Sequence, residues 1–414
     1  MTAVLFNDHI IQSALDLDVY KINMMFGAFK LYPHTQVRYE LIVRSEESLA
    51  SLAEQVEREI AQLEQCRFSD HDIQYLRQQA NYLDADFFDY LGEFRFKPRD
   101  QVTVTTTNNG QLRVSIQGLW HQTILYETLV MSIISEVRSR RFWADISYSH
   151  FADVLERKIT HLTSQLAQRG IDHFQFSEMG SRRRFSAQVQ REVVDYLRHH
   201  VPDLLSGTSN YHLAREFNLT PIGTVAHEWF MAHQQLVATR DSQQVALDRW
   251  QTLFDGKLGI ALTDTIGIEA FLKDFTFERA AAYAGVRHDS GCPFTWGDKI
   301  IAHYQSLGID PTSKVLIFTD GLNFDRALDI AEYFAGKAKV SFGIGTFLAN
   351  DMRDWTVDDV TYQPLSMVVK MTRCSDGPVA KISDEPEKAM CEDEAFLTQL
   401  KQQFGLLPSY DIAS

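Results

Sequence analysis

Short polar runs follow apolar stretches at seven places in the second half of the chain, and their residue types could bind a phosphorylated molecule. The runs are Glu178–Ser181, Gly207–Asn210, Gly223–His227, Asp264–Thr265, Arg287–Gly291, Thr319–Gly321 and Gly343–Thr346. Each follows a stretch with the apolar composition of a buried strand. Because loops at the carboxyl ends of parallel strands meet on one face of an α/β fold, we expect these runs to form one active-site face.

Arginine and aspartate are the groups in these runs that best fit a phosphorylated sugar. Arginine binds phosphate through paired hydrogen bonds, and carboxylates bind sugar hydroxyls or the water shell of Mg²⁺. A single aspartate there is also an ordinary helix N-cap. The arginines are Arg182, Arg183, Arg184, Arg215 and Arg287, and the aspartates are Asp264, Asp289 and Asp320. In SEMGSRRRFS, residues 177–186, we expect Arg182 to enter an anion pocket, and Arg183 and Arg184 to point to other faces.

The stretch GIGTF at residues 343–347 offers backbone N–H groups that a phosphate can approach closely. It is not a dinucleotide fingerprint, because Leu348 stands where G-x-G-x-x-G needs its third glycine. A plain strand turn is the alternative. The small-residue turn at residues 319–321 favours the phosphate cradle.

His227 begins a segment, HEWFMAH, that is close to a zinc-protease motif but lacks its second histidine. Met231 stands at the required position and His233 lies six residues on, off the same helix face. An imidazole at a strand end can instead be a nucleophile or a phosphoryl acceptor, and a locally hydrogen-bonded histidine is the alternative. Lys370 could form a Schiff base, which would indicate a lyase or aldolase, although phosphate binding or ion pairing is more usual for such a lysine.

The periodicity predicts two folding units and a C-terminal segment. Residues 1–119 predict an α+β domain with helices at 11–31, 49–63 and 73–91, a strand at 35–44 and a hairpin about Asn109–Gly110. Residues 120–365 predict a helical stretch to about Gln168 and then seven strands, one of them PIGTVA at 221–226, in an irregular α/β barrel or an open sheet. Residues 366–414 predict a hairpin about Asp376–Pro378 and a tail that packs back on the first domain.

Composition narrows the class of protein. The chain has 414 residues, 45% of them hydrophobic, and a formal net charge of −15, which argues against nonspecific binding to nucleic acid or anionic membrane. We find no signal-peptide pattern and no apolar run of about 18 residues. The four cysteines form no C-x-x-C pair, so we expect reduced thiols and a cytoplasmic location.

Nine motifs in order resemble the nicotinate phosphoribosyltransferases, which have the type II phosphoribosyltransferase fold. They are LDLDVYKINMM, YELIVR, SEMGSRRRFS, SGTSN, GTVAHEW, LTDT, GVRHDSG, FTDGLN and FGIGTFL. The resemblance implies an antiparallel-sheet domain joined to an irregular α/β barrel. It also implies a reaction of nicotinate with phosphoribosyl pyrophosphate that yields nicotinate mononucleotide and pyrophosphate.

The same resemblance implies roles for individual residues. His227 would be phosphorylated transiently by ATP, Arg182 would contact pyrophosphate or the ring, and Arg287 would contact the nicotinate carboxylate or a phosphate. Asp289 would bind the ribose hydroxyls, and Asp264 would also bind substrate. The 5′-phosphate would lie against Asp320, Gly321, Gly345 and Thr346.

Four further positions bear on the pyridine ring. Tyr20 would stack on the ring from a partner subunit, which implies a homodimer. Asn210 stands where related nicotinamide enzymes carry an aspartate, and a neutral side chain suits a carboxylate better. Met179 replaces a common phenylalanine and Cys292 an acidic residue, so the local ring contacts can differ.

We expect Mg²⁺ and ATP to take part, with no metal bound directly by protein side chains. A phosphoribosyltransferase for nicotinamide or quinolinate and a non-catalytic sensor on the same fold are the alternatives.

Overall fold

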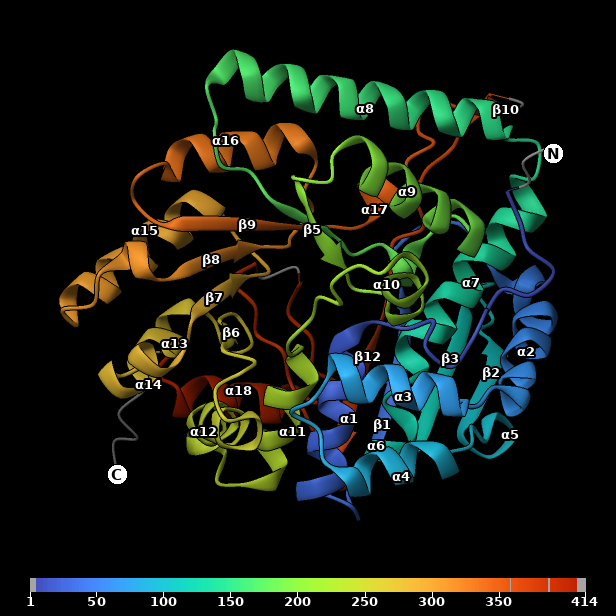
Figure 1. The fold of residues 1–414 in the computed structure, drawn as a ribbon. Coiled ribbons are helices and arrows are strands. Elements are labelled where there is room, and N and C mark those ends of the chain that lie inside the picture. Colours follow the sequence, from blue (N-terminus) through green and yellow to red (C-terminus); the bar gives the residue numbers. More distant parts are fainter. Residues whose placement is uncertain (1–4, 358, 386–387, 408–414) are drawn as a thin grey trace.

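The computed structural model describes residues 5–357, 359–385 and 388–407. Its first sheet is antiparallel, with the order β13-β12-β1-β3-β2 (Figure 1). The strands are β1 (Gln36–Val43), β2 (Val102–Thr106), β3 (Leu112–Leu119), β12 (Met367–Cys374) and β13 (Gly377–Pro378). The predicted hairpin joins β2 to β3, and Gly110 at its tip has φ 74°, a conformation that favours glycine. The last strands of the chain therefore complete a sheet begun by the first.

Helices cover this sheet, and the structure shortens one predicted helical stretch and divides another. They are α1 (Val19–Leu31), α2 (Ala53–Gln62), α3 (Asp70–Gln79), α4 (Ala85–Glu93), α5 (Pro98–Gln101), α6 (Trp120–Thr123) and α7 (Tyr126–Phe142). Residues 11–18 are not helical. The stretch 73–91 divides because Asp84 accepts a hydrogen bond from the Phe87 amide and so starts a new helix.

The second sheet has six parallel strands in the order β5-β4-β9-β8-β7-β6. They are β4 (Phe176–Glu178), β5 (Leu205–Thr208), β6 (Ile260–Leu262), β7 (Gly285–His288), β8 (Val315–Phe318) and β9 (Lys339–Ile344). The strands β5 and β6 end the order, so the α/β barrel is open on one side. This is the irregular barrel that the resemblance implies.

The predicted strand at residues 221–226 is wrong. This segment makes only one bridge to the sheet, between Pro221 and Thr208. Proline cannot donate to a strand ladder, and a Cβ at Gly223 would lie 2.9 Å from the Tyr20 nitrogen and from Val19 Cβ. The segment is therefore a loop pressed against the start of α1.

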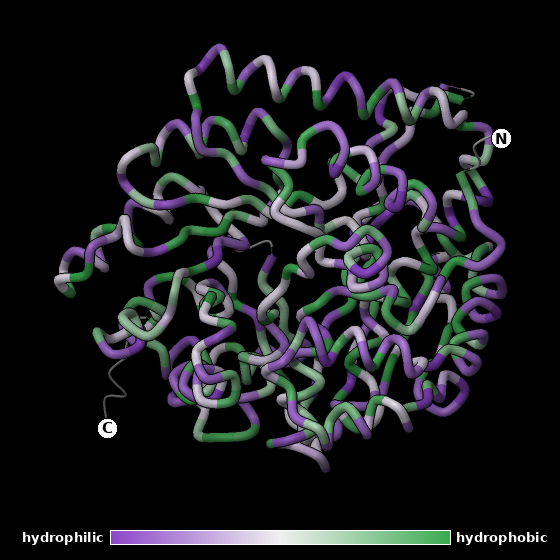
Figure 2. Tube along the Cα trace, in the orientation of Figure 1, coloured by the Kyte–Doolittle hydropathy of each residue, from purple (hydrophilic) through white to green (hydrophobic). Residues whose placement is uncertain are grey.

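The outer layer of the barrel is helical (Figure 1). The helices are α8 (Tyr148–Arg169), α9 (Ala187–His200), α10 (Tyr211–Phe217), α11 (His227–Leu236), α12 (Ser242–Phe254), α13 (Ile268–Asp274), α14 (Phe277–Ala282), α15 (Pro293–Ser306), α16 (Phe324–Phe334), α17 (Thr346–Ala349) and α18 (Glu394–Gln403). Hydropathy alternates along α8, which buries one face only (Figure 2). Short strands β10 (Thr356–Val357) and β11 (Val360–Thr361) pair with each other. One hydrophobic core runs through both sheets.

The C-terminal segment joins the two units. Strand β12 pairs with β1 through Met367–Cys374, and the chain then crosses to the barrel, where the Ile382 amide donates to the Thr265 carbonyl. Residues 408–414 of the predicted tail lie outside the described residues. The domain boundaries at 119 and 365 stay predictions.

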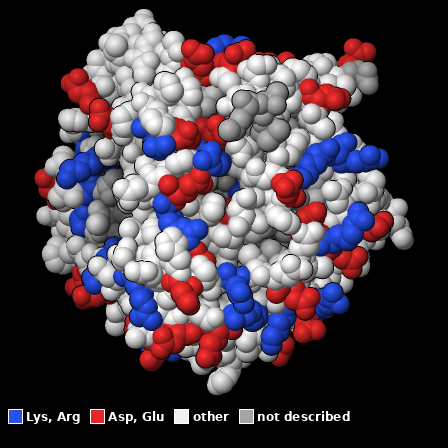
Figure 3. All heavy atoms as spheres, turned by 45° about the vertical axis from the view of Figure 1, so that its right-hand side comes forward, with Lys and Arg blue, Asp and Glu red and all other residues white. Residues whose placement is uncertain are grey.

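Charged side chains of both signs are intermixed on the face shown in Figure 3, with no single-sign field. Within the described ranges, no helix is long and apolar enough to cross a membrane.

Arg184, the last of the three consecutive arginines, is a buried structural residue. It is 1% exposed, and its two terminal nitrogens lie 2.7 and 2.8 Å from the two Asp16 carboxylate oxygens. Burial works against the Asp16 charge, but Arg184 lowers the pKa of Asp16 to about 2. The pair ties the N-terminal segment to the barrel wall, and Arg184 does not line the cavity at the strand ends, in agreement with the expectation that it points to another face.

We expect Arg184→Met to lower the free energy of unfolding by about 3–5 kcal/mol, because it leaves the buried Asp16 carboxylate without its partner. Urea unfolding followed by circular dichroism measures the change. The matched control is Arg183→Met, which removes the neighbouring arginine and leaves the Asp16 pair intact. Equal unfolding midpoints for the two variants would contradict this account.

Candidate active site

A cavity of about 400 Å³ opens at the carboxyl ends of β4, β7, β8 and β9, which is where the sequence predicts the active-site face. The chain brings most of the predicted site residues to its wall: Tyr20, Met179, Arg182, His227, Arg287, Asp289, Gly321, Gly345 and Thr346. Asn210, Asp264 and Asp320 do not line it. The polar strand ends therefore converge, although not every residue at them faces the cavity.

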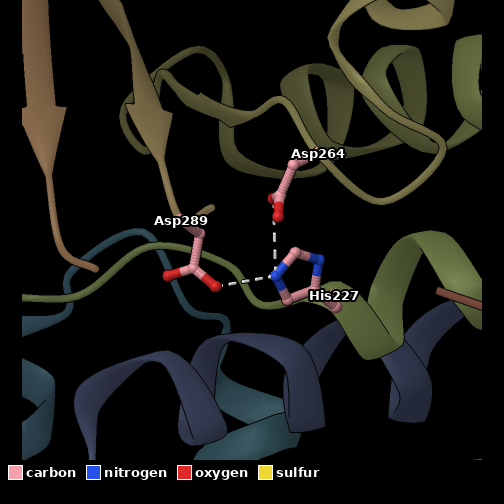
Figure 4. A group of neighbouring side chains, drawn as sticks. All are labelled: His227, Asp264 and Asp289. Atoms are coloured by element: carbon pink, nitrogen blue, oxygen red, sulfur yellow. Dashed lines mark hydrogen bonds and ion pairs between the residues drawn. The ribbon is translucent and has the colours of Figure 1, made fainter. Parts of the chain in front are cut away.

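His227 lies at the first position of α11 and faces two carboxylates (Figure 4). Its Nε2 is 2.9 Å from Asp289 Oδ2 and 3.5 Å from Asp264 Oδ1, and its Nδ1 is 3.1 Å from Thr265 Oγ1. Burial, together with the charge of Lys381, lowers the pKa of His227. A neutral ring that donates from Nε2 to the carboxylates keeps the lone pair on Nδ1. The ring is thus oriented and kept nucleophilic.

Lys381 reaches this cluster from the C-terminal segment. Its Nζ lies 2.9 Å from Asp264 Oδ2 and 3.7 Å from Asp289 Oδ2, and the residue is 4% exposed. Burial would raise the pKa of Asp289, but the His227 ring, Arg287 and Lys381 hold that pKa well below its usual range. Lys381 therefore helps His227 and Arg287 to keep these carboxylates ionised.

The sequence interpretation missed Lys381. A signal was present, since Lys381 stands between apolar residues in PVAKI and so is expected to be buried.

The ligand atoms of His227, Asp264 and Asp289 lie within 4.8 Å of one another, a spacing compatible with a metal ion. In the described chain, the Lys381 ammonium supplies the positive charge at this cluster.

Arg182 and Arg183 both line the cavity, which corrects the expectation that Arg183 points to another face. Arg182 Nε lies 3.4 Å from Asp18 Oδ2, its Nη1 lies 3.4 Å from Glu127 Oε1, and its guanidinium lies 5.7 Å from the centre of the Tyr20 ring. Burial and the neighbouring Arg182 and Arg44 lower the pKa of Arg183 to about 10. Positive charge is thus concentrated on this wall.

Arg287 stands on β7, on the wall that also carries His227. Its Nη1 donates to the Val225 carbonyl over 2.9 Å, and its buried Nε has no hydrogen-bond partner among the described atoms. A buried donor without a partner is costly to the folded state, so an anionic ligand would stabilise it. Arg287 is therefore suited to bind a carboxylate or a phosphate.

Glycines form the floor of the cavity beside β9. A Cβ at Gly345 would lie 2.7 Å from the Met179 carbonyl oxygen, so the close approach of these two strands requires glycine. Gly321 has φ 57°, which also favours glycine. The arrangement leaves the backbone near Thr346 accessible from the cavity, as a phosphate cradle requires.

Two expected cavity residues have structural roles instead. Asn210 caps α10, with its Oδ1 accepting from the Leu213 amide and its Nδ2 donating to Asp16 and Ser181. Asp320 binds the Lys388 ammonium through both carboxylate oxygens, at 2.8 and 2.7 Å. The predicted contact of Asn210 with substrate has no support in this geometry.

The structure also bears on the residues predicted to lie near the pyridine ring. Cys292 is the exposed N-cap of α15 and does not line the cavity, whereas Met179 does. The resemblance predicts a Tyr20 that enters the site of a partner subunit. In the described chain, Tyr20 lies in the wall of its own cavity and is 8% exposed.

The open α/β barrel carries a polar cavity at its strand ends, lined by arginines, carboxylates and a histidine, and it is joined to an antiparallel-sheet domain. This is the architecture that the resemblance to the type II phosphoribosyltransferases implies. Comparison with known proteins gives the family. Residues 174–407 match the nicotinate phosphoribosyltransferase family, and residues 15–135 match its N-terminal domain. The chain belongs to the nicotinate phosphoribosyltransferase family.

Individual relatives agree with this assignment. The chain is 65% identical to a nicotinate phosphoribosyltransferase of Vibrio vulnificus over 100% of this chain and 96% of the relative. A crystal structure of nicotinate phosphoribosyltransferase from Vibrio cholerae superposes with a TM-score of 0.95 at 58% identity, covering 97% of this chain and 95% of that one. A crystal structure of nicotinate phosphoribosyltransferase from Porphyromonas gingivalis superposes with a TM-score of 0.87 at 32% identity. The match covers 96% of this chain and 100% of that one.

Proposed function

We propose that this chain transfers the phosphoribosyl group of phosphoribosyl pyrophosphate to nicotinate, which yields nicotinate mononucleotide and pyrophosphate for NAD salvage. The names of the relatives support this reaction. The observation that carries it is the cavity wall, on which Arg183 and Arg287 have no carboxylate ion pair among the described residues and lie beside the His227–Asp289 pair. Such a wall suits one ligand with a carboxylate and another with several phosphates.

In the proposed complex, the two substrates meet between the arginine wall and the glycine floor. Arg182 contacts pyrophosphate or the ring, Arg287 contacts the nicotinate carboxylate or a phosphate, and Tyr20 and Met179 pack on the ring. The 5′-phosphate binds at the Gly321, Gly345 and Thr346 backbone. The glycines permit the close approach and the positive φ of this floor, so its backbone N–H groups lie open to a phosphate.

Transfer proceeds through stretching of the ribose C1–oxygen bond as the pyridine nitrogen attacks the opposite face. Positive charge develops on the ribose and negative charge on the departing pyrophosphate. Asp289 faces the cavity and stabilises the first through the ribose hydroxyls, while the arginines stabilise the second. The residues therefore act by placing fixed charges and by holding the reactants in line.

We further propose that ATP phosphorylates His227 and that hydrolysis of this phosphohistidine is coupled to transfer. The His227 side chain is 16% exposed and is held by Asp289, Asp264 and Thr265, and its lowered pKa favours the neutral ring that a phosphoryl acceptor requires. Mg²⁺ accompanies the phosphates and neutralises their charge. Asp289 lines the cavity with its side chain 29% exposed, so it could accept hydrogen bonds from the water shell of this ion.

The homodimer and the cytoplasmic location are also proposals. Light scattering on the purified chain measures the first, and cell fractionation the second.

The central experiment incubates the purified protein with phosphoribosyl pyrophosphate, Mg²⁺ and ATP, and compares nicotinate with nicotinamide. We expect mononucleotide and ADP with nicotinate, and little product with nicotinamide, because the arginine wall favours a carboxylate over a neutral amide. The absence of product with nicotinate would overturn the proposal. Preference for nicotinamide would favour the alternative substrate.

The role of Lys381 predicts a shift in the pH profile. His227 accepts a phosphoryl group only as the neutral ring, so ADP formation is lost as the pH falls through the pKa of His227. Lys381 helps to lower that pKa, and Lys381→Met removes its positive charge. We therefore expect the acid limb of ADP formation to move to higher pH in this variant.

The matched control for this profile is Lys314→Met. Lys314 is also buried, but its ammonium binds the Ala281 and Tyr283 carbonyls at the opposite end of the barrel. We expect the acid limb of ADP formation in Lys314→Met to coincide with that of the unchanged protein. An unshifted limb in Lys381→Met would contradict the assigned electrostatic role.

A further inference from the structure

Lys21 is a buried ammonium that the reaction described above does not use. It lies on α1 with 0% exposure, and its Nζ binds two carboxylates from different elements. One is Glu228 on α11, whose Oε1 is 2.8 Å away, and the other is Glu127 on α7. None of the three side chains lines the cavity.

Each of these carboxylates is attached to a different part of the site. Glu127 is also paired with Arg182, which lines the cavity, over 3.4 Å. Glu228 follows His227 directly, in the first turn of α11. A continuous chain of ionic contacts therefore runs from the start of α11 through Lys21 to the arginine wall.

The charges in this chain compete for one another. Lys21 is shared, so the more strongly Glu228 holds its ammonium, the less it neutralises Glu127. A less neutralised Glu127 holds Arg182 more strongly, and Arg182 is then less available to an anionic ligand. Burial raises the pKa of Glu228, while Lys21 and Arg182 lower that of Glu127 against its burial. Glu228 is thus the member whose charge changes most readily.

We propose that Lys21 is a positioning residue that couples the start of α11, and hence His227, to the anion affinity of Arg182. The inference rests on the proposed function, because it deepens the roles given there to Arg182 and His227. Its physical basis is a single buried ammonium that two carboxylates share across three helices, α1, α7 and α11 (Figure 1). His227 is adjacent to Glu228 in sequence. A change of charge at His227 therefore alters how strongly Glu228 holds the Lys21 ammonium, and through Glu127 it alters the anion affinity of Arg182.

The proposal predicts that substitutions of Glu228 and of Lys21 have opposite effects on substrate binding. Glu228→Gln releases Lys21 to Glu127, which frees Arg182, so the KM for phosphoribosyl pyrophosphate without ATP should fall. Lys21→Met leaves Glu127 to hold Arg182 alone, so the same KM should rise. We expect each change in KM to be about 5-fold or more, the lower end of typical coupling between two sites. In the double variant, Glu228→Gln should have no further effect, because the link is absent. Lys21→Arg should restore a KM close to the original.

A double-mutant cycle with steady-state kinetics tests these expectations. An unchanged KM in Glu228→Gln, or an effect of equal size with and without Lys21, would overturn the inference. Should Lys21→Met not fold, the fall in KM in Glu228→Gln alone still decides it. The matched control is Arg240→Met, which breaks the ion pair with buried Asp274 away from the cavity and should leave KM unchanged.

Calorimetric titration with pyrophosphate separates this inference from the proposed function, because it needs no turnover. A Kd for pyrophosphate that falls in Glu228→Gln and rises in Lys21→Met supports the inference even where no mononucleotide forms, and the proposed reaction alone then fails. If Kd and KM are unchanged in Glu228→Gln, and the protein does make mononucleotide, the inference is overturned and the proposed reaction is retained.

Discussion

Replacement of His227 by alanine is expected to abolish ATP hydrolysis and to leave a slow, ATP-independent transfer to nicotinate. Removal of a nucleophile removes the whole covalent step, so ADP formation should fall on the order of 10³-fold or more. The transfer should continue at the rate that the unchanged protein shows without ATP, because Asp289 and the arginines stay in place. Coupled assays of ADP and mononucleotide, run on the same samples, give both rates.

A phosphate-transfer experiment makes this test direct. With ATP labelled at the γ-phosphate, the unchanged protein should carry acid-labile, base-stable label, and His227→Ala should carry none. His212→Asn is the matched control, since His212 lies on α10, bound to Ser13 and outside the cavity wall. An alanine variant that ATP still stimulates at normal stoichiometry would exclude His227 as the phosphoryl acceptor.

The sequence predicts the active-site face well because strand ends carry local signals. An apolar stretch followed by Asp289 or Gly321 is visible in a few residues, and parallel pairing then brings such ends together. The same logic wrongly predicts a strand at residues 221–226. The composition there is strand-like, but the close passage of Gly223 along α1 is a tertiary contact that no local pattern reveals.

Other features depend on contacts between distant parts of the chain. Lys381 meets Asp264 from a segment more than a hundred residues away, and only its apolar neighbours in sequence indicate burial. Arg184 separates from Arg182 and Arg183, which both line the cavity, because it follows the 3₁₀ turn Ser181–Arg183 in an extended conformation. Asn210 directly precedes α10 and caps it, a role that asparagine commonly has and that the resemblance to a substrate-binding position did not reveal.

The two carboxylates beside His227 differ in a way that defines their separate roles. Asp289 lines the cavity and its side chain is 29% exposed, whereas the Asp264 side chain is 1% exposed and turned toward Lys381 and Ser290. Both contact the His227 ring. Only Asp289, however, can also reach a ribose in the cavity, so only Asp289 should act in both transfer and ATP hydrolysis.

Asp289→Asn is therefore expected to lower kcat for transfer by about 10²–10³-fold with and without ATP, the usual cost of losing one fixed charge that stabilises a transition state. The KM for nicotinate should change little, because the arginine wall is untouched. Asp264→Asn is the matched comparison: it should lower ADP formation, through the orientation of His227, and leave the ATP-independent transfer near its original rate. Steady-state kinetics on both variants, with and without ATP, separate the two carboxylates. Equal losses of ATP-independent transfer in both would mean that the cluster acts as one structural unit, and Asp289 would then have no separate role at the ribose.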